Sequence, residues 1–422
     1  MKLRWPMAAN DDTRFYGWRY AAIGSTLNAL GSGFYGRGFG VYFLPLSRDL
    51  GLSHTSTSLI FGFASIEAGI QAPLTGYLID RFGARLMMLF GAALAGLGFL
   101  LLPLANDFLS FVLIYVGVIG LGINAGFHSA VGAVVNQWFL RHRGLAFGIT
   151  SVGIALGGRI FNNIMAYVVL NFGWRPAVTI AGLVILIVAL PLAFLIRDTP
   201  EDIGQFPDGR RPPNLDSDTK SSSGDFTVRE AFSTSSYWLL AAGISLRIAV
   251  QAAIIVHIVP LMVWKGLGEV HGAIIIATIS FSAVGTRLLM GWWGDRWDKR
   301  KVVVIGMFAG MASVLILLFA PGELWVMMIF AVVFSLTDGA AGLTWAMIGD
   351  FFGRASFATL RGVITFVVSL GSLASPVFAG RVFDVTQSYY WALLPLVGVY
   401  AVASIVFIVI RNPRPTDSAG TT

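Results

Sequence analysis

Residues 76–85 read Gly-Tyr-Leu-Ile-Asp-Arg-Phe-Gly-Ala-Arg, and residues 291–300 read Gly-Trp-Trp-Gly-Asp-Arg-Trp-Asp-Lys-Arg. The first glycine, the Asp-Arg pair and the last arginine match at one offset, 215 residues. Pro45 and Pro260, which close two apolar runs, differ by the same 215 residues. A turn with basic residues would explain one copy, but a repeat at a constant offset indicates two equivalent halves.

Long apolar runs surround both copies. The chain has 422 residues, of which 56% are hydrophobic and 12% charged, which is too little charge to cover a soluble protein of this size. Runs of about 20 apolar residues are long enough to span a bilayer. They predict twelve helices, near 17–45, 57–79, 86–105, 110–138, 144–170, 175–196, 237–263, 270–293, 302–320, 324–351, 359–383 and 389–410.

We therefore expect an all-α membrane protein built of two six-helix bundles. The first bundle takes residues 1–196 and the second takes residues 237–422, including a short tail. The segment 197–236 between them is polar and rich in Pro, Ser and Asp, which predicts a cytoplasmic linker. The N-terminus carries no cleavable signal pattern, so the first helix is expected to be retained.

The positive residues indicate an orientation. With both termini in the cytoplasm, 21 of the 29 Lys and Arg residues fall in cytoplasmic segments and four fall outside. This bias is typical of multi-pass proteins of the bacterial inner membrane, and it explains the net charge of +7 without nucleic acid. Arg143 and Arg361 are counted here as cytoplasmic. The remaining four, Arg37, Arg159, Arg247 and Arg287, lie inside predicted helices.

Several classes of protein lack support. The chain has no cysteine, its five histidines show no metal-binding spacing, and no phosphate-binding Gly-Lys-Ser/Thr loop is present. No nucleophile and base stand in a catalytic pattern, so neither an enzyme nor a cofactor is expected. A membrane sensor would need an output domain, and the linker and tail are too small to supply one. We expect a monomer in the lipid bilayer.

The repeated loop resembles the signature of the major facilitator superfamily, and the resemblance covers the whole chain. It implies two bundles that alternate access to a central path. The aspartates are expected to cap or pair with neighbouring helix ends and hold one gate closed. The residues assigned to this gate are Gly76, Asp80, Arg81, Arg85, Asp295, Arg296 and Arg300.

Three further segments resemble the monocarboxylate and oxalate:formate porters within that superfamily. They are Tyr-Gly-Trp at 16–18, Trp-Phe-x-Arg-x-Arg-Gly-Leu-Ala-x-Gly at 138–148, and His-Ile-Val-Pro-Leu at 257–261. The second is echoed by Phe351-Phe352 and Arg361-Gly362 at a shifted offset. Arg14 and Phe15 depart from the pattern, which has an acidic residue and a glycine there.

The charges inside the helices favour an anion. A charge at mid-bilayer costs at least about 2.5–3.5 kcal/mol and should face the protein interior. Four arginines oppose two acids of similar depth, Glu67 and Asp338. Arg287 stands where monocarboxylate porters carry the arginine that pairs with the substrate carboxylate, although Ala283 replaces the aspartate of the animal proteins. Arg37 aligns with a lysine of their outer pathway.

Other polar side chains share helical faces with these charges. Each of these side chains has an alternative role in helix packing. A lone histidine in an apolar helix is more often a hydrogen-bonded packing residue, and asparagines form hydrogen bonds between helices. Arg37 can equally take an interhelical role, because a straight helix would point it away from Asn28. Arg159 and Arg247 either define an unusual substrate or neutralise the two acids. The proposed substrate-binding set is completed by Asn28, Tyr35, Asn124, His128, Asn162, Asn163, Gln251, His257 and Trp345.

The first functional hypothesis is uptake of a carboxylate by proton symport. Substrate binding to an arginine would free Asp338 or Glu67 to take up a proton. The second is carboxylate exchange of the oxalate:formate kind, although helix 359–383 lacks the lysine that the oxalate transporter contributes there. The third is export of anionic metabolites or drugs.

Overall fold

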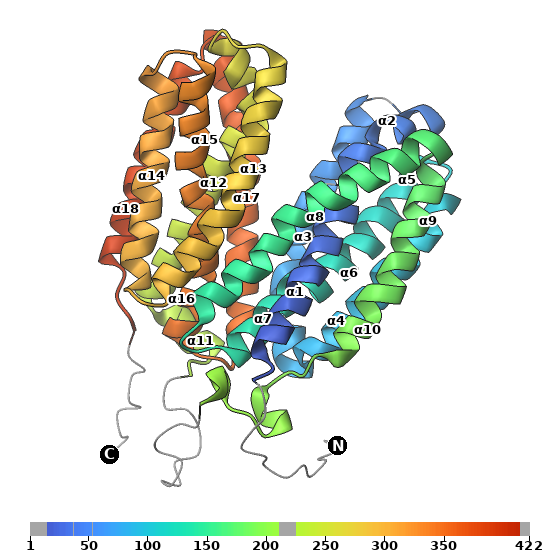
Figure 1. Cartoon of the computed structure of the whole chain (residues 1–422), viewed down its shortest axis with the longest axis vertical. Helices are drawn as coiled ribbons and strands as arrows, with labels where there is room; N and C mark the ends of the chain where they lie inside the picture. The colour runs from blue at the N-terminus through green and yellow to red at the C-terminus, as the bar shows by residue number, and fades with distance from the viewer. Residues whose placement is uncertain (1–14, 37, 53, 211–224, 414–422) are drawn as a thin grey trace.

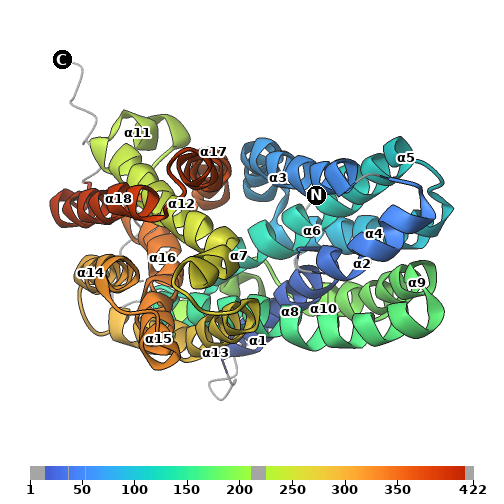
Figure 2. The same cartoon turned by 90° about the horizontal axis from the view of Figure 1, so that it is seen from above.

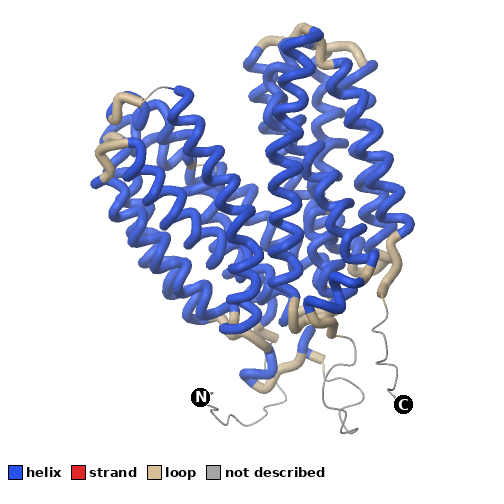
Figure 3. Tube along the Cα trace, turned by 180° about the vertical axis from the view of Figure 1, so that it is seen from behind, coloured by secondary structure: helices blue, strands red, loops and turns tan. Residues whose placement is uncertain are grey.

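The computed structural model describes residues 15–36, 38–52, 54–210 and 225–413, and every regular element in these ranges is a helix (Figure 3). Within the described ranges, ten helices are long and apolar enough to cross a membrane. Two more complete the predicted twelve. The first is described as the segments before and after residue 37, and the second carries Glu67 and Gln71 within its apolar stretch.

The first six helices form one bundle, blue to green in Figure 1. Three of the six are interrupted by short π-helical segments. Their bounds are α1 (Gly17–Gly31), η1 (Ser32–Gly36) and α2 (Phe39–Asp49); α3 (His54–Phe82); α4 (Ala84–Leu101) and η2 (Leu102–Leu104); α5 (Phe108–Val112), η3 (Leu113–Gly120), α6 (Leu121–Ile123), η4 (Asn124–Ser129) and α7 (Ala130–Trp138); α8 (Arg143–Phe172); and α9 (Trp174–Val184), η5 (Ile185–Ala189) and α10 (Leu190–Leu195).

The last six helices form the second bundle, yellow to red in Figure 1. A connecting stretch with η6 (Pro200–Ile203), η7 (Pro207–Gly209) and α11 (Val228–Ser233) precedes it. The bundle consists of α12 (Ser235–Trp264), α13 (Glu269–Gly294), α14 (Lys299–Phe319), α15 (Leu324–Gly339) with α16 (Ala341–Phe352), α17 (Phe357–Thr386) and α18 (Tyr390–Val409).

The two bundles approach each other at one end and diverge toward the other (Figure 1). We call these the convergent end and the splayed end. Seen from above, α3 lies beside α17 and α8 lies near α13, so two helix pairs connect the bundles (Figure 2). The convergent end is where α3 and α13 finish and where α8 and α17 begin.

An aspartate of one bundle caps a helix of the other bundle at each of these two contacts. The Asp80 carboxylate accepts hydrogen bonds from the backbone N–H groups of Ala358 at 3.1 Å and Thr359 at 2.8 Å. Asp295 accepts in the same way from Gly144 at 2.7 Å and Leu145 at 2.9 Å. Each carboxylate thereby satisfies free N–H groups and faces the positive end of the helix dipole.

The first glycine of each repeat permits this approach. A Cβ on Gly76 would lie 2.2 Å from the carbonyl oxygen of Ala358, and one on Gly291 would lie 2.6 Å from that of Gly144. Gly144 is therefore equivalent to Ala358, and Arg361 is equivalent to Phe147. The sequence echo between Arg143-Gly144 and Arg361-Gly362 does not mark equivalent positions, because α17 begins four residues before Arg361.

The arginines of the repeats bind within their own bundles. Arg85 donates from its backbone N–H to Asp198 at 2.7 Å and from its side chain to the Phe194 carbonyl at 3.1 Å. Arg300 forms an ion pair with Asp298 at 2.6 Å. Arg81 donates to the Tyr77 hydroxyl and Arg296 to the Trp292 carbonyl. The aspartates connect the bundles, and the arginines order the loops.

Further polar contacts reinforce the convergent end. Arg143, which is buried, forms an ion pair with Asp350 of the second bundle at 2.8 Å, and Lys299 reaches the other oxygen of that carboxylate at 2.7 Å. Arg354 pairs with Glu201 of the connecting stretch at 2.9 Å. Arg143 is thus an interior clamp rather than a solvated topology signal.

We expect Asp80→Asn and Asp295→Asn each to lower the free energy of unfolding by about 1 kcal/mol, because each carboxylate accepts two backbone N–H bonds through its two oxygens and an amide has only one acceptor oxygen. The two losses should add, since the caps lie at different helix pairs. Thermal unfolding of the purified chain measures this. The control is Asp384→Asn, an exposed position on α17. Equal stability of the cap variants and the control would contradict the role of the caps.

Candidate functional site

Arg287 and Asp338 form an ion pair inside the molecule, with 2.6 Å between the Arg287 Nη2 and the Asp338 Oδ2. The Arg287 side chain is 10% exposed and the Asp338 side chain 24% exposed. Nη1 of Arg287 also donates to the Ser151 carbonyl of α8 at 2.5 Å. One guanidinium therefore connects α13 and α15 to the first bundle.

The backbone around position 338 brings the two side chains together. A Cβ on Gly339 would lie 2.7 Å from the Thr286 carbonyl oxygen, so the missing side chain lets α15 approach α13. The Thr286 hydroxyl donates to the Ser335 carbonyl at 2.9 Å across the same contact. The helix then breaks between α15 and α16, one residue after Gly339. Such discontinuous helices are typical of transporter binding sites.

Arg247 lies beside this break and is 1% exposed. Its Nη1 donates to the Gln251 side chain at 2.8 Å and to the Thr337 carbonyl at 3.3 Å. Gln251 in turn donates to the Thr337 hydroxyl at 3.2 Å. Asp338 and Arg287 are the charged groups whose fields act on Arg247. Arg247 and Gln251 thus hold Thr337, the residue that precedes Asp338, through hydrogen bonds.

A second polar group lies in the first bundle. Asn28 is buried, donates to the Thr150 carbonyl at 3.1 Å, and has its side-chain oxygen 2.9 Å from Nδ1 of His128. Asn124 donates to the Glu67 carboxylate at 3.3 Å. Asn124 and His128 both lie in the π-helical segment η4. π-Helical insertions occur frequently at functional sites.

Tyr35 lies in another π-helical segment, η1. Its hydroxyl is buried with no hydrogen-bond partner among the described residues. A Cβ on Gly120 would be 2.5 Å from that hydroxyl and 3.1 Å from the Glu67 carboxylate, so both oxygens point at the same glycine. The π-helical segment η1 departs from the 3.6-residue repeat of an α-helix within the first helix. Arg37 itself lies outside the described residues.

Arg159 lies at the contact between α8 and α13 and is partly exposed. It donates to the Ala277 carbonyl at 2.5 Å, and its guanidinium is 5.8 Å from the centre of the Phe281 ring. Asn162 is half-buried one turn further along, and Asn163 is exposed. Arg159 forms no ion pair with Glu67 or Asp338 in the described part of the chain.

Arg361 was assigned to the cytoplasmic surface by the sequence, and the structure corrects this. It lies one turn inside α17, donates to the His128 carbonyl of the other bundle at 3.2 Å, and lies 4.9 Å from the centre of the Trp345 ring. Its position four residues after a capped helix start decides this, because the charge then falls within the span. The apolar run predicted the start of this helix near residue 359, but it could not show that the Arg361 side chain reaches the other bundle.

His257 lies away from these groups. Its Nδ1 is 2.9 Å from the Tyr389 hydroxyl and its Nε2 is 3.0 Å from the Pro376 carbonyl. Tyr389 immediately precedes α18, so this cluster belongs to the splayed end of the second bundle. Both ring nitrogens have protein partners, which is the arrangement of a packing histidine.

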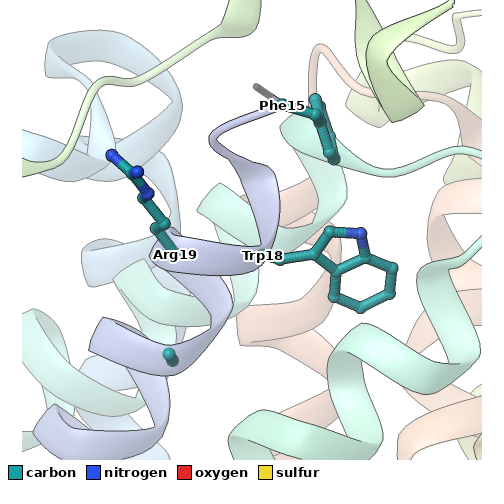
Figure 4. Close-up of a pocket in the computed structure, with 4 residues that line it drawn as sticks. Phe15, Trp18 and Arg19 are labelled. Atoms are coloured by element: carbon teal, nitrogen blue, oxygen red, sulfur yellow. The ribbon is translucent and has the colours of Figure 1, made fainter.

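Two hollows occur elsewhere on the described surface. One, of ≈ 460 Å³, is lined by the first turn of α1 and the residue before it. Phe15 and Trp18 lie on one side of it and Arg19 lies on the other (Figure 4). The other, of ≈ 270 Å³, lies between α3 and α17 and is mostly apolar. Neither is lined by the interior charges, so we place the candidate site at the Arg287–Asp338 pair.

The interior charges do not balance. Arg159, Arg247, Arg287 and Arg361 lie within the helical array together with two carboxylates, Glu67 and Asp338. Among the described residues the array therefore has an excess of two positive charges when both acids are ionised. No group of three or more potential metal ligands exists in the described ranges.

Comparison with known proteins defines the class. The family model of the Major Facilitator Superfamily matches residues 21–287 and 253–422. A crystal structure of the major facilitator superfamily transporter FucP in the outward conformation superposes with a TM-score of 0.71, at 14% identity, covering 95% of this chain and 100% of that one. The chain belongs to the major facilitator superfamily, and the predicted all-α fold of two six-helix bundles is confirmed.

Comparison with protein sequences shows which members of the superfamily this chain resembles. The human monocarboxylate transporter 11 is 27% identical over 98% of this chain and 87% of its own length. The uncharacterized MFS-type transporter YcxA of Bacillus subtilis is 27% identical over 90% of this chain and 92% of its own length. The chain is thus a multi-pass membrane transporter, not an enzyme, and it resembles proteins named monocarboxylate transporters.

We expect His257→Phe to lower thermal stability without changing substrate affinity or the pH profile of transport. The phenyl ring keeps the bulk and removes hydrogen bonds to Tyr389 and Pro376, at a cost of about 1 kcal/mol each. Thermal unfolding and transport by the same preparation measure both quantities. An altered pH profile with unchanged stability would instead assign His257 to the transport cycle.

Proposed function

We propose that this protein is a secondary active transporter of a carboxylate anion, which it takes up together with a proton by alternating access. The observation that carries the proposal is the Arg287–Asp338 pair, which lies at a contact between the two bundles. The gate, the interior charges and the relatives support it.

Arg287 is the proposed substrate-binding residue. Guanidinium groups bind carboxylates through two parallel hydrogen bonds, which an ammonium group cannot reproduce. In this structure the Asp338 carboxylate occupies one side of the guanidinium, and the Ser151 carbonyl occupies another. Asp338 therefore stands where a substrate carboxylate would compete. The likeness to monocarboxylate transporters supports the same class of ligand.

Asp338 is the proposed proton carrier. When a substrate carboxylate takes its place on Arg287, Asp338 loses the positive charge that favours its ionised form. The bound substrate also brings a second negative charge close to Asp338, while Arg247 stays bound to Gln251 and Thr337. Loss of the ion pair and a neighbouring like charge both favour the protonated carboxyl, so anion binding promotes proton uptake. The pair replaces the same-helix pair of the animal transporters, whose aspartate position holds Ala283 here. Glu67, which contacts the Asn124 amide, is the second candidate.

The same displacement would couple binding to the gate. Arg287 contacts Ser151 on α8, and α8 is the helix that Asp295 caps at the convergent end. A ligand that turns the guanidinium away from Ser151 weakens one of the two helix pairs. With the proposed cytoplasmic termini, the convergent end is the cytoplasmic gate, and its opening releases anion and proton together.

Carboxylate exchange is the second candidate function. The sequence argument against it was the lack of an intramembrane lysine on the eleventh helix. Arg361 supplies a positive charge from that helix, which removes the argument. Exchange needs no titrating acid, whereas proton symport needs one. A variant of Asp338 that cannot carry a proton therefore distinguishes the two mechanisms.

We expect Asp338→Asn to abolish stimulation of uptake by an inward proton gradient while exchange of internal for external substrate continues. The amide cannot carry a proton but keeps the size of the side chain. Proteoliposome uptake of labelled lactate, benzoate and butanedioate measures both modes, with Asp384→Asn as the control. Stimulation by the gradient that survives in Asp338→Asn would exclude Asp338 as the proton carrier.

We expect Arg287→Gln to weaken binding of the transported carboxylate by about tenfold or more, and Arg287→Lys to restore part of the loss. Ligand-induced thermal stabilisation reports binding separately from transport. The control is Arg381→Gln, an exposed arginine of α17. Unchanged stabilisation by the carboxylate in Arg287→Gln would refute its role.

A further inference from the structure

Arg361 reaches from one bundle into the other. It is carried by α17 of the second bundle, and its Nη1 donates to the backbone carbonyl of His128 in the first bundle at 3.2 Å. Trp345, whose ring centre is 4.9 Å from the guanidinium carbon, belongs to α16 of the second bundle. The aromatic face therefore moves with Arg361, whereas the carbonyl acceptor does not.

Gly132 makes the space for this guanidinium. A Cβ at position 132 would lie 1.5 Å from Nη1 and 2.7 Å from Cζ of Arg361. A methyl group at this position of α7 would therefore displace the guanidinium. The first bundle thus contains a recess, lined by its backbone, that receives a cation from the second bundle.

Arg361 has no carboxylate partner within the described ranges. Arg143 and Arg287 have one each, Asp350 at 2.8 Å and Asp338 at 2.6 Å. The Nε atoms of both these arginines are enclosed by protein without a partner, but no nitrogen of Arg361 is enclosed in this way. Arg361 uses one hydrogen bond of the five that a guanidinium can donate. It is a half-buried cation whose other donors have no protein acceptor in the described part of the chain.

The acceptor of Arg361 depends on the state of the gate. A movement that separates the bundles at the convergent end would take the His128 carbonyl out of reach of Arg361. The guanidinium would keep the Trp345 ring and would exchange its carbonyl acceptor for water of the open path, where an entering anion can meet it. A carboxylate can fill the position, because arginine binds carboxylates through its planar edge while its face stacks on an aromatic ring.

We propose that Arg361 is a second carboxylate-binding residue, held by the His128 carbonyl when the convergent end is closed and available to the transported anion when that end is open. This rests on the proposed carboxylate transport. The transport path then contains two anion-binding arginines, each of which is accessible to the anion in a different state of the convergent end. Arg287 binds in the state with a closed convergent end, and Arg361 binds the anion that leaves or enters through that end.

A purely structural clasp has the opposite consequence. If Arg361 only held the bundles together, its removal would favour the state open at the convergent end. The KM for substrate offered at that end would then fall, because more of the protein would be competent to bind from there. A binding role predicts a rise, so the sign of the change separates the two.

The experiment compares the KM at the two faces of the membrane. Vesicles of both orientations carry the full chain, and uptake of labelled lactate, benzoate and butanedioate is measured. Because the chain has no cysteine, Asn106→Cys in the loop before α5 reports the exposed face through an impermeant maleimide. The clasp control is Gln137→Ala, which removes two contacts between α7 and Arg354 across the bundles, one to the Arg354 carbonyl at 3.1 Å and one from the Arg354 Nε at 2.8 Å.

We expect Arg361→Gln to raise the KM at the convergent face by about tenfold or more, as for other charge-assisted hydrogen bonds, and to change the KM at the splayed face less than twofold. Arg361→Lys should lie between. Gly132→Ala, which keeps the cation but fills its recess, should not raise the KM at the convergent face.

Three outcomes would overturn the proposal: a fall of the KM at the convergent face as in Gln137→Ala, an equal change at both faces, or a rise in Gly132→Ala as large as in Arg361→Gln. Failure of the proposed function is a separate observation, because it shows as absence of carboxylate transport by the unsubstituted chain.

Discussion

The Arg287–Asp338 ion pair depends on a constraint that governs the whole interior: a charge between transmembrane helices needs a partner inside the protein. Arg287 satisfies this with a carboxylate of its own bundle and a carbonyl of the other bundle. The pair therefore has two structural consequences. It holds a broken helix against α13, and it ties the second bundle to α8.

The same constraint distributes the acids of the molecule between two tasks. Asp80 and Asp295 face backbone N–H groups at helix starts, and Asp350 neutralises Arg143 and Lys299. These acids close the convergent end and leave few carboxylates for the interior. Arg159 and Arg361 donate to backbone carbonyls instead. A carbonyl accepts a hydrogen bond but does not cancel a charge, so the positive excess of the interior persists.

Much of the site could be predicted residue by residue, but its pairings could not. Arg287 and Asp338 were both identified from the sequence as interior charges, yet nothing in the spacing joined them, because they lie on α13 and α15 and meet through a close approach at Gly339. His257 and His128 are both single histidines within apolar helices, so the sequence does not separate their roles. The structure gives His257 two partners at the splayed end and places His128 at the contact with Arg361.

The sequence by itself determined the number of spans, the duplication and the excess of positive charge, because apolar length, repeat offset and composition are properties of the chain read in order. Only the tertiary structure decided which interior charges are paired and added Arg361 to them. Arg361 shows the reason: one helical turn separates a solvated loop from the membrane interior, and the start of α17 is set by the Asp80 cap from the other bundle. A contact between residues so far apart in the chain leaves no local pattern.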